Sequence, residues 1–300
     1  MTCIDNKQLI QTYVITSQSH KEVSQITAKF LIKLNGQDEL DITARLPNVM
    51  YLGGDSTPAF NNSYQDNTIS DGSRLTRVNF TKMVFTAKFL LMSNDFYDQK
   101  LVRHEIYQLF GDRGLVRFRT DNDLQKVMYG RPTSFEINFI ADGYDDSLFS
   151  IQFEIPSGYK YSLVRSDKID IDHVSFGMNF HLDEQPLYTQ TANSFRIFNP
   201  SDIAIDPYYQ RHDLMLLIQF LGSSYQITNN TNGTNYQYNG AIQSSDSLVL
   251  NGLSTTLNGN PASQNTNFGY IKLEKGWNDI TVSGATSHTT TFSFPFIYID

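Results

Sequence analysis

Alternation of apolar and polar residues with a period of two is the strongest pattern along this chain. It predicts strands, because successive side chains of a β-strand point to opposite faces of a sheet. In the first half of the chain the alternating runs lie at residues 26–34, 40–46, 83–91, 135–139 and 149–155. Turn residues around Gly36 separate the first two runs, and those around Gly143 separate the last two. Each of these pairs therefore predicts a β-hairpin.

One helix is predicted among these strands, over residues 95–110. Residues 93–95 (Ser-Asn-Asp) offer side-chain oxygens that can accept hydrogen bonds from the free N–H groups of a first helical turn. The apolar stripe expected of a helix that covers a core is formed by Val102, Ile106, Leu109 and Phe110. Gly111 is expected to end the helix with a positive φ. The order of elements predicts an antiparallel sheet covered by this helix.

The alternation stops between Pro47 and Arg77. This segment is polar and rich in glycine, asparagine, serine and aspartate. A loop of this length is uncommon within a compact domain and tends to be functional or mobile. Two interpretations remain open: a disordered insertion, or an arm that becomes ordered only against a neighbouring subunit or a partner.

Short apolar runs separated by clusters of glycine, asparagine and serine fill the second half. The runs lie at residues 176–180, 195–197, 214–220, 248–250, 271–273, 280–282 and 292–298, and the clusters at 228–233, 259–267 and 283–287. This rhythm predicts a β-sandwich. We place the domain boundary near residue 160, which gives domains 1–160 and 161–300 with residues 162–172 as connector. The predicted fold class is mainly β: an N-terminal antiparallel sheet or barrel-like domain with one covering helix, followed by a sandwich.

Composition excludes several classes of protein. The 300 residues include 18% charged residues and carry a net charge of −8, which argues against a binder that tracks nucleic-acid phosphates. No apolar run approaches the ~20 residues that a membrane-spanning helix needs. Residues 1–10 include Asp5 and Lys7 and no apolar stretch, so no signal peptide is expected. Cys3 is the only cysteine, which excludes a disulfide scaffold and a cysteine-ligated zinc site.

The search for catalytic and metal-binding motifs is negative. The sequence has no phosphate-binding glycine loop, no nucleophile elbow and no zinc-binding histidine pair. The most metal-like cluster, Asp170, Asp172 and His173, is better interpreted as a solvated acidic connector. Asp142, Asp145 and Asp146 are better interpreted as a hairpin turn than as a calcium loop. We therefore expect no enzyme, no cofactor and no bound metal.

Carbohydrate chemistry stays open at one residue. Carboxylates for glycoside hydrolysis are available at Glu184, Asp202, Asp206, Asp213 and Glu274, but the aromatic side chains that line a sugar cleft would include only one tryptophan, Trp277. Trp277 is interpreted either as part of a turn whose indole caps the edge of the sandwich, or as a stacking platform for a sugar.

The order of these patterns resembles the distal tail protein (Dit) family of siphophages that infect Gram-positive bacteria. Residues 74–77 (Arg-Leu-Thr-Arg) lead into a long strand, the helix and two further strands, as in the N-terminal domain of that family. Residues 194–202 with Asp206-Pro207 resemble the opening of its galectin-like domain. Residues 227–233, 248–251 and 273–280 follow its later rhythm, including the turn around Gly276-Trp277-Asn278. Residues 1–25 and 47–72 match nothing in the family.

The resemblance implies a structural virion component at the distal end of the phage tail, without catalysis. N-terminal domains would form a hexameric ring around a channel through which DNA passes. The ring would join the tail tube to the tail-associated hub protein, and outward galectin-like domains would carry receptor-binding or other tail-tip proteins. Two alternatives are a lectin-like module for host cell-wall polysaccharide, with Trp277 as its candidate residue, and a tail-tube subunit.

Overall fold

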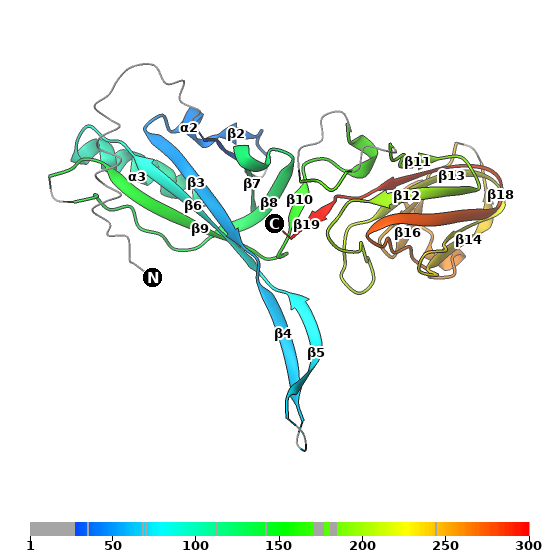
Figure 1. Ribbon diagram of the computed structural model, residues 1–300. Helices are drawn as coiled ribbons and strands as arrows, with labels where there is room; N and C mark the ends of the chain where they lie inside the picture. Colours follow the sequence, from blue (N-terminus) through cyan, green and yellow to red (C-terminus); the bar gives the residue numbers. More distant parts are fainter. Residues whose placement is uncertain are drawn as a thin grey trace.

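The structure is a computed structural model that describes residues 28–34, 36–67, 69, 71–111, 113–141, 143–170, 177–180, 185–243 and 245–299. Among these residues, the buried apolar side chains form two clusters, one drawn from residues 30–155 and the other from residues 159–298. Sheets surround both clusters (Figure 1). The prediction of a mainly β fold is therefore confirmed.

An antiparallel sheet encloses the first cluster. Its strand order is β2-β1-β7-β8-β9-β6-β3. The bounds are β1 Phe30–Lys33, β2 Leu40–Asp41, β3 Val49–Thr57, β6 Met83–Leu91, β7 Val116–Thr120, β8 Lys126–Pro132 and β9 Ser147–Ile155. Phenylalanine rings from three strands fill the centre: the Phe118 ring lies 4.6 Å from that of Phe153 and 5.4 Å from that of Phe30.

Helix α3 (Phe96–Phe110) covers this cluster as the sequence predicts. Asp95 caps it, since its Oδ1 accepts hydrogen bonds from the N–H groups of Tyr97 and Asp98, both at 2.8 Å. Its predicted stripe is buried, and the Phe110 ring lies 5.6 Å from Phe153 on β9. The prediction for Gly111 is wrong: its φ is −74°, because the helix ends there with a Gly111 N–H to Gln108 carbonyl bond in right-handed geometry.

Two predicted strands take other forms. Only Leu40 and Asp41 of the run 40–46 pair with β1; Asp41 then caps a short helix, α2 (Ile42–Arg45), by accepting a hydrogen bond from the Thr43 N–H. The run 135–139 is not a strand, and Phe139 forms only a single bridge to Ser147. Its carbonyls serve α3 instead: that of Phe135 accepts from the Tyr107 hydroxyl at 3.1 Å, and that of Ile137 from the Gln99 amide.

The second cluster lies within one sheet that folds over on itself. Its path is β11-β18-β13-β15-β16-β17, while β12 also pairs with β18 and β14 with β13. The bounds are β11 Thr189–Gln190, β12 Ser194–Asn199, β13 Met215–Asn229, β14 Asn235–Ile242, β15 Leu248–Asn251, β16 Ser254–Leu257, β17 Asn260–Pro261 and β18 Gly276–Ser293. One end of β13 and β18 is flanked by β12 and β14, and the other by β11 and β15, which gives the two layers of the predicted sandwich.

Bulges make this fold-over possible. The pairing of β13 with β18 shifts register between Leu221 and Gln226, where Gly222 has φ +152° and Gly284 has φ +81°. Buried positions change parity across the bulge, from Phe220 to Tyr225, so side chains on both sides of the bend point into the same cluster. The predicted turn at 283–287 is thus wrong: residues 280–282 and the first part of 292–298 belong to a single strand, β18.

The two halves are joined by more than the chain that runs between them. Strand β10 (Lys160–Ser162) pairs with β8 on one side and with β19 (Ile297–Tyr298) on the other.

One-turn 3-10 helices occur at η1 (Asp121–Asp123), η2 (Ser166–Lys168) and η4 (Ser263–Asn265). The sequence-based interpretations that involve Cys3, Asp142, Asp172, His173 and Glu184 lie outside the described residues.

Candidate assembly surface

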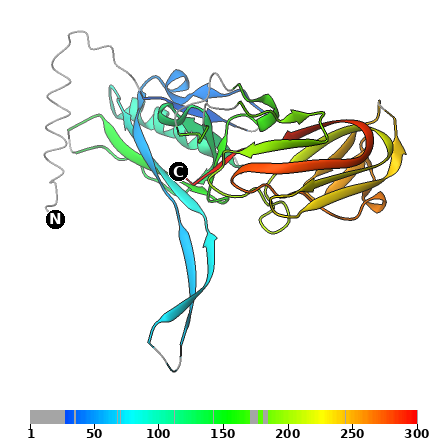
Figure 2. The ribbon, with the colours of Figure 1, turned by 45° about the vertical axis from the view of Figure 1, so that its right-hand side comes forward.

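A long β-hairpin occupies the segment that the sequence leaves as a loop. Strands β4 (Phe60–Asp66) and β5 (Ser73–Phe80) form a two-stranded ribbon that continues from β3 and β6 and projects away from both sheets (Figures 1 and 2). We call residues 60–80 the arm. The interpretation of this segment as a disordered insertion is wrong.

One face of the arm is apolar. Phe60 pairs with Phe80, Asn62 with Val78, and Tyr64 with Leu75. Positions 60, 62 and 64 share a face because they are spaced by two, and directly opposed partners share the face of their counterparts. A bulge between Ser63 and Tyr64 brings Leu75 onto the same face as Val78.

The opposite face of the arm is polar. Its pairs are Asn61 with Asn79, Ser63 with Arg77, and Gln65 with Arg74. The Arg77 Nε donates a hydrogen bond to the Asn79 Oδ1 at 3.1 Å, so neighbouring side chains on this face also contact one another. The arm is therefore an amphipathic ribbon.

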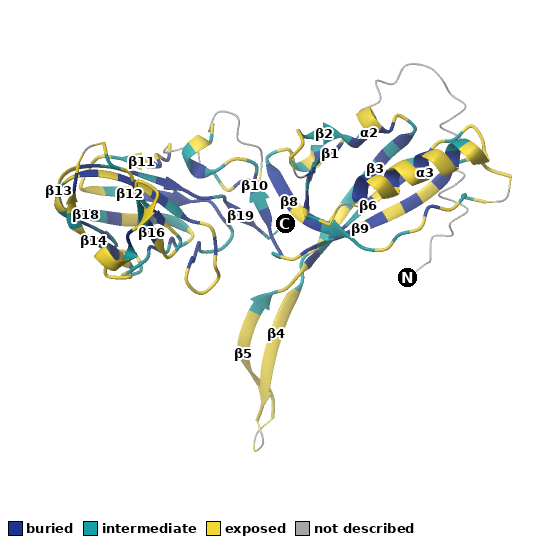
Figure 3. Ribbon diagram, turned by 180° about the vertical axis from the view of Figure 1, so that it is seen from behind, coloured by how far each residue is buried: buried dark blue, intermediate teal, exposed yellow. Residues whose placement is uncertain are grey.

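The apolar face is open to solvent over most of its length. The exposed fractions are 60% for Phe60, 61% for Tyr64, 50% for Leu75 and 54% for Val78. Figure 3 shows the arm as the longest exposed stretch of strand in the protein. An isolated two-stranded hairpin is at best marginally stable in water, and burial of apolar surface contributes roughly 25 cal/mol per Å². The arm thus has a face whose burial against another molecule would stabilise it.

Aromatic contacts fix the root of the arm. The Phe80 ring lies 5.5 Å from that of Phe60 and 5.4 Å from that of Tyr159, which in turn lies 5.8 Å from His212. The backbone is also close: a Cβ on Gly158 would lie 2.3 Å from the Thr81 carbonyl oxygen. Since Tyr159 and His212 lie on the side of the second cluster, the root contacts both halves of the protein.

Trp277 is the second residue of β18 and does not lie in a turn. Its half-buried indole lies 5.0 Å from the Phe198 ring, and the Arg196 guanidinium lies 4.6 Å from the indole centroid. The cation covers one face of the ring. Sugar binding at Trp277 remains a prediction.

The carboxylates considered for hydrolysis are engaged by different partners. Asp202 accepts from the Ile299 N–H at 2.9 Å, Asp206 from the N–H groups of Tyr208 and Tyr209, and Asp213 pairs with Arg165. Glu274 pairs with Lys272 at 2.7 Å. Within the part of the chain that the structure describes, no group of histidine, cysteine, aspartate and glutamate side chains could hold a metal ion. In that same part, no helix has the length and apolarity to cross a bilayer.

Part of the first half of the chain is similar to a known protein family. Residues 46–155, which include the arm and α3, match the family model described as the phage tail protein RIFT-related domain. This part of the chain is therefore similar to a phage tail domain. No curated protein matches the sequence.

One solved structure extends the likeness beyond residues 46–155. The crystal structure of the Dit protein of phage SPP1, described as a paradigm of the hub adsorption apparatus in phages that infect Gram-positive bacteria, matches with a TM-score of 0.65 and 10% identity. That match covers 89% of this chain and 99% of the SPP1 chain. The phage p2 baseplate in its activated conformation with strontium matches with a TM-score of 0.43 and 11% identity, covering 89% of this chain and 97% of that one. The resemblance to siphophage distal tail proteins is therefore confirmed at the level of the fold.

Proposed function

We propose that this protein forms a hexameric ring at the distal end of a siphophage tail. The ring joins the tail tube to the tail-associated hub protein and leaves a central channel for DNA. The C-terminal half points outward and carries receptor-binding or other tail-tip proteins. The proposal involves no catalytic step.

The uncovered apolar face of the arm is the observation that carries this proposal. A subunit of a closed ring must present surfaces that its neighbours bury. The arm offers such a surface, and its root is fixed by contacts with both halves, so its direction is set before assembly. We propose that the arm packs on a neighbouring subunit, which would bury Tyr64, Leu75 and Val78.

The arm also has the free edges that assembly can use. Among the residues that the structure describes, strands β4 and β5 pair only with each other, so each has one edge unpaired there. Such edges can add a strand from another chain. Edge pairing and burial of the apolar face would therefore act together at one interface.

Electron microscopy of the purified full chain, together with sedimentation velocity, tests the proposal. We expect ring-shaped particles with six-fold symmetry, and in whole phage particles the same ring below the tail tube. A chain that stays monomeric at all concentrations and is absent from the distal tail of intact particles would refute the proposal. Stacked rings along the whole tail would instead identify a tail-tube subunit.

A further inference from the structure

A strip of outward-facing side chains lies on the C-terminal sandwich. Residues 270–274 alternate: Ile271 and Leu273 are buried, while Tyr270, Lys272 and Glu274 are partly exposed. The prediction of a strand at 271–273 is wrong, since Leu273 forms only a single bridge, to Ile205. The segment is nevertheless extended, so its outward side chains lie in a row about 6.6 Å apart.

Tyrosines from a neighbouring loop extend this row. The Asp206 Oδ1 accepts hydrogen bonds from the N–H groups of Tyr208 and Tyr209, both at 2.9 Å, which holds the loop closed. The Tyr208 ring stacks on Tyr270, with centroids 5.2 Å apart and planes at 15°. Tyr209 meets Tyr208 edge to face at 4.8 Å and is 74% exposed. The result is a rigid group of three aromatic rings at the surface.

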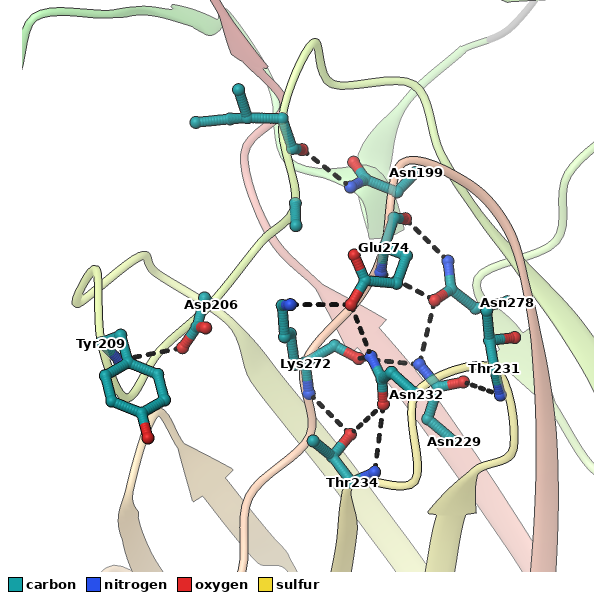
Figure 4. Close-up of polar contacts among 12 residues, drawn as sticks. Asn199, Asp206, Tyr209, Asn229, Thr231, Asn232, Thr234, Lys272, Glu274 and Asn278 are labelled. Atoms are coloured by element: carbon teal, nitrogen blue, oxygen red, sulfur yellow. Dashed lines mark hydrogen bonds and ion pairs between the residues drawn. The ribbon is translucent and has the colours of Figure 1, made fainter. Parts of the chain in front are cut away.

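Polar groups lie at the other end of the row (Figure 4). The Lys272 Nζ lies 2.7 Å from the Glu274 Oε1, and the Asn232 amide donates to the same oxygen at 3.3 Å. The carboxylate raises the pKa of Lys272 through this contact, so the ammonium stays charged at neutral pH. Because the two charges are paired, the polar end presents donors and acceptors without an unpaired cation or anion.

The backbone of the row offers nothing to an added strand. The N–H of Lys272 donates to Thr234, and its carbonyl accepts from the amides of Asn229 and Asn232. Leu273 exchanges both of its backbone hydrogen bonds with Ile205. The N–H and the carbonyl of Glu274 both bond to the Asn278 side chain. An extended peptide that binds by strand addition therefore finds no free backbone group between Lys272 and Glu274.

Only side chains can recognise a ligand here, and they are of two kinds. Aromatic rings bind the C–H-bearing faces of sugar rings, since the face of a π-system is negative. Hydroxyl groups both donate and accept, so a sugar hydroxyl can donate to the Glu274 carboxylate and accept from the Lys272 ammonium, while Asn232 holds both residues in place. We propose that this surface, formed by Tyr208, Tyr209, Tyr270, Asn232, Lys272 and Glu274, binds a neutral oligosaccharide. We call it the tyrosine strip.

The proposal is independent of ring formation. It also differs from sugar binding at Trp277, whose indole lies on β18 with Arg196 over one face. Saccharide binding is read out on the full chain by glycan array, whereas the ring is read out by imaging. Failure of one proposal therefore does not imply failure of the other.

A glycan array of neutral and charged oligosaccharides, followed by calorimetry with the best neutral binder, tests the tyrosine strip. We expect Tyr209→Ala and Glu274→Gln each to weaken binding by about ten-fold or more, the usual effect of removing a well-placed anchor. Tyr97→Ala is the matched control, because Tyr97 on α3 is 75% exposed and lies outside the strip. The affinity of Tyr97→Ala for the oligosaccharide should equal that of the wild type.

Three outcomes would overturn the proposal. The first is that no oligosaccharide on the array binds. The second is that binding survives both strip variants with unchanged affinity, or is lost in Trp277→Phe and retained in the strip variants. The third is that a purified tail protein binds at the tyrosine strip and that no saccharide displaces this protein.

Discussion

Lys160 and Tyr298 oppose each other across the antiparallel pair of β10 and β19, although the whole C-terminal sheet lies between them in the sequence. Strand β10 also pairs with β8 of the first sheet, so a continuous ladder of hydrogen bonds runs from one half of the protein to the other. Tyr298 adds side-chain contacts to this ladder. Its hydroxyl donates to the Met178 carbonyl at 3.2 Å, and the Lys126 ammonium lies 5.0 Å from its ring centroid.

Substitution of Tyr298 should separate the contribution of its ring from that of its hydroxyl. The side chain is 1% exposed. Tyr298→Ala should therefore lower the free energy of unfolding by about 3–5 kcal/mol, as expected for a large buried aromatic side chain. Tyr298→Phe loses one hydrogen bond and should cost about 1 kcal/mol. Denaturant unfolding of both variants checks this, and equal losses in the two would contradict the assigned role of the ring.

Gly284, at the bend of the sandwich, should be less replaceable than Gly259. A Cβ there would lie 2.6 Å from the Ser224 Oγ, whereas Gly259 has nearly the same φ (+80° against +81°) and nothing within 4 Å. Alanine at Gly259 should cost about 1–2 kcal/mol from left-handed strain alone. Alanine at Gly284 should cost about 1–3 kcal/mol more, because the bend is already filled. Chemical denaturation of the two variants measures this difference, and equal costs would count against the packing argument.

Stability should fall on mild acidification because of His288. This buried residue has Nε2 at 3.1 Å from the Ala192 carbonyl oxygen and Nδ1 at 3.1 Å from the Thr290 hydroxyl, contacts that suit a neutral ring. Burial lowers its pKa in the folded protein. Between that lowered pKa and the ordinary value near 6.5, the unfolded chain binds more protons, so the free energy of unfolding decreases as the pH falls below about 6.5.

Denaturation midpoints at several pH values between 7.5 and 5.5 check this dependence. The variant His288→Gln should show a shallower decrease than the wild type. His212 contributes in the same direction in both proteins, since burial also lowers its pKa. His104→Gln, at an exposed position of α3, is the control for the substitution itself. A wild-type slope in His288→Gln would rule out His288 as the source.

A charge on the apolar face of the arm should disrupt the ring without unfolding the subunit. Val78→Asp puts a carboxylate among Phe60, Tyr64 and Leu75, where a neighbouring subunit would bury it unpaired. Asn79→Asp places the same charge on the next residue, on the polar face, and is the matched control. We expect monomers for Val78→Asp and rings for Asn79→Asp in sedimentation velocity, and a cooperative thermal unfolding transition for Val78→Asp that shows its subunit is folded. Intact rings in Val78→Asp would remove the apolar face from the interface.

Local signals are what the sequence reveals best. Helix α3 is predictable because Asp95 caps it and a single apolar stripe marks its buried side. The arm is not, since Asn62 interrupts its apolar face and the bulge opposite Ser63 and Tyr64 adds an extra residue, Thr76, to β5, which breaks the period of two there. Strand β18 is taken for two strands for the same reason, because residues 283–287 contain a bulge whose composition is that of a turn.

Trp277 and the tyrosine strip also differ in how clearly the sequence reveals them. Trp277 stands out in the sequence because it is the only tryptophan, whereas the tyrosine strip collects side chains from three separate segments, 206–209, 229–234 and 270–274. Each segment alone is typical of an ordinary loop. Contacts between distant residues bring them together, such as the pairing of Ile205 with Leu273 and the bond from Asn232 to Lys272, and these long-range contacts have no local signature.

The hydrogen-bonded ladder through β8, β10 and β19 holds the two halves together even where the covalent chain between them is cut. A protease that cut the chain once between β10 and β11 would remove the covalent tether, yet β19 would remain seated beside β10 like a docked peptide. The two fragments would migrate together in a native gel and separate only in denaturant. A protein built in this way tolerates a single cut that would separate two domains held together by a linker alone.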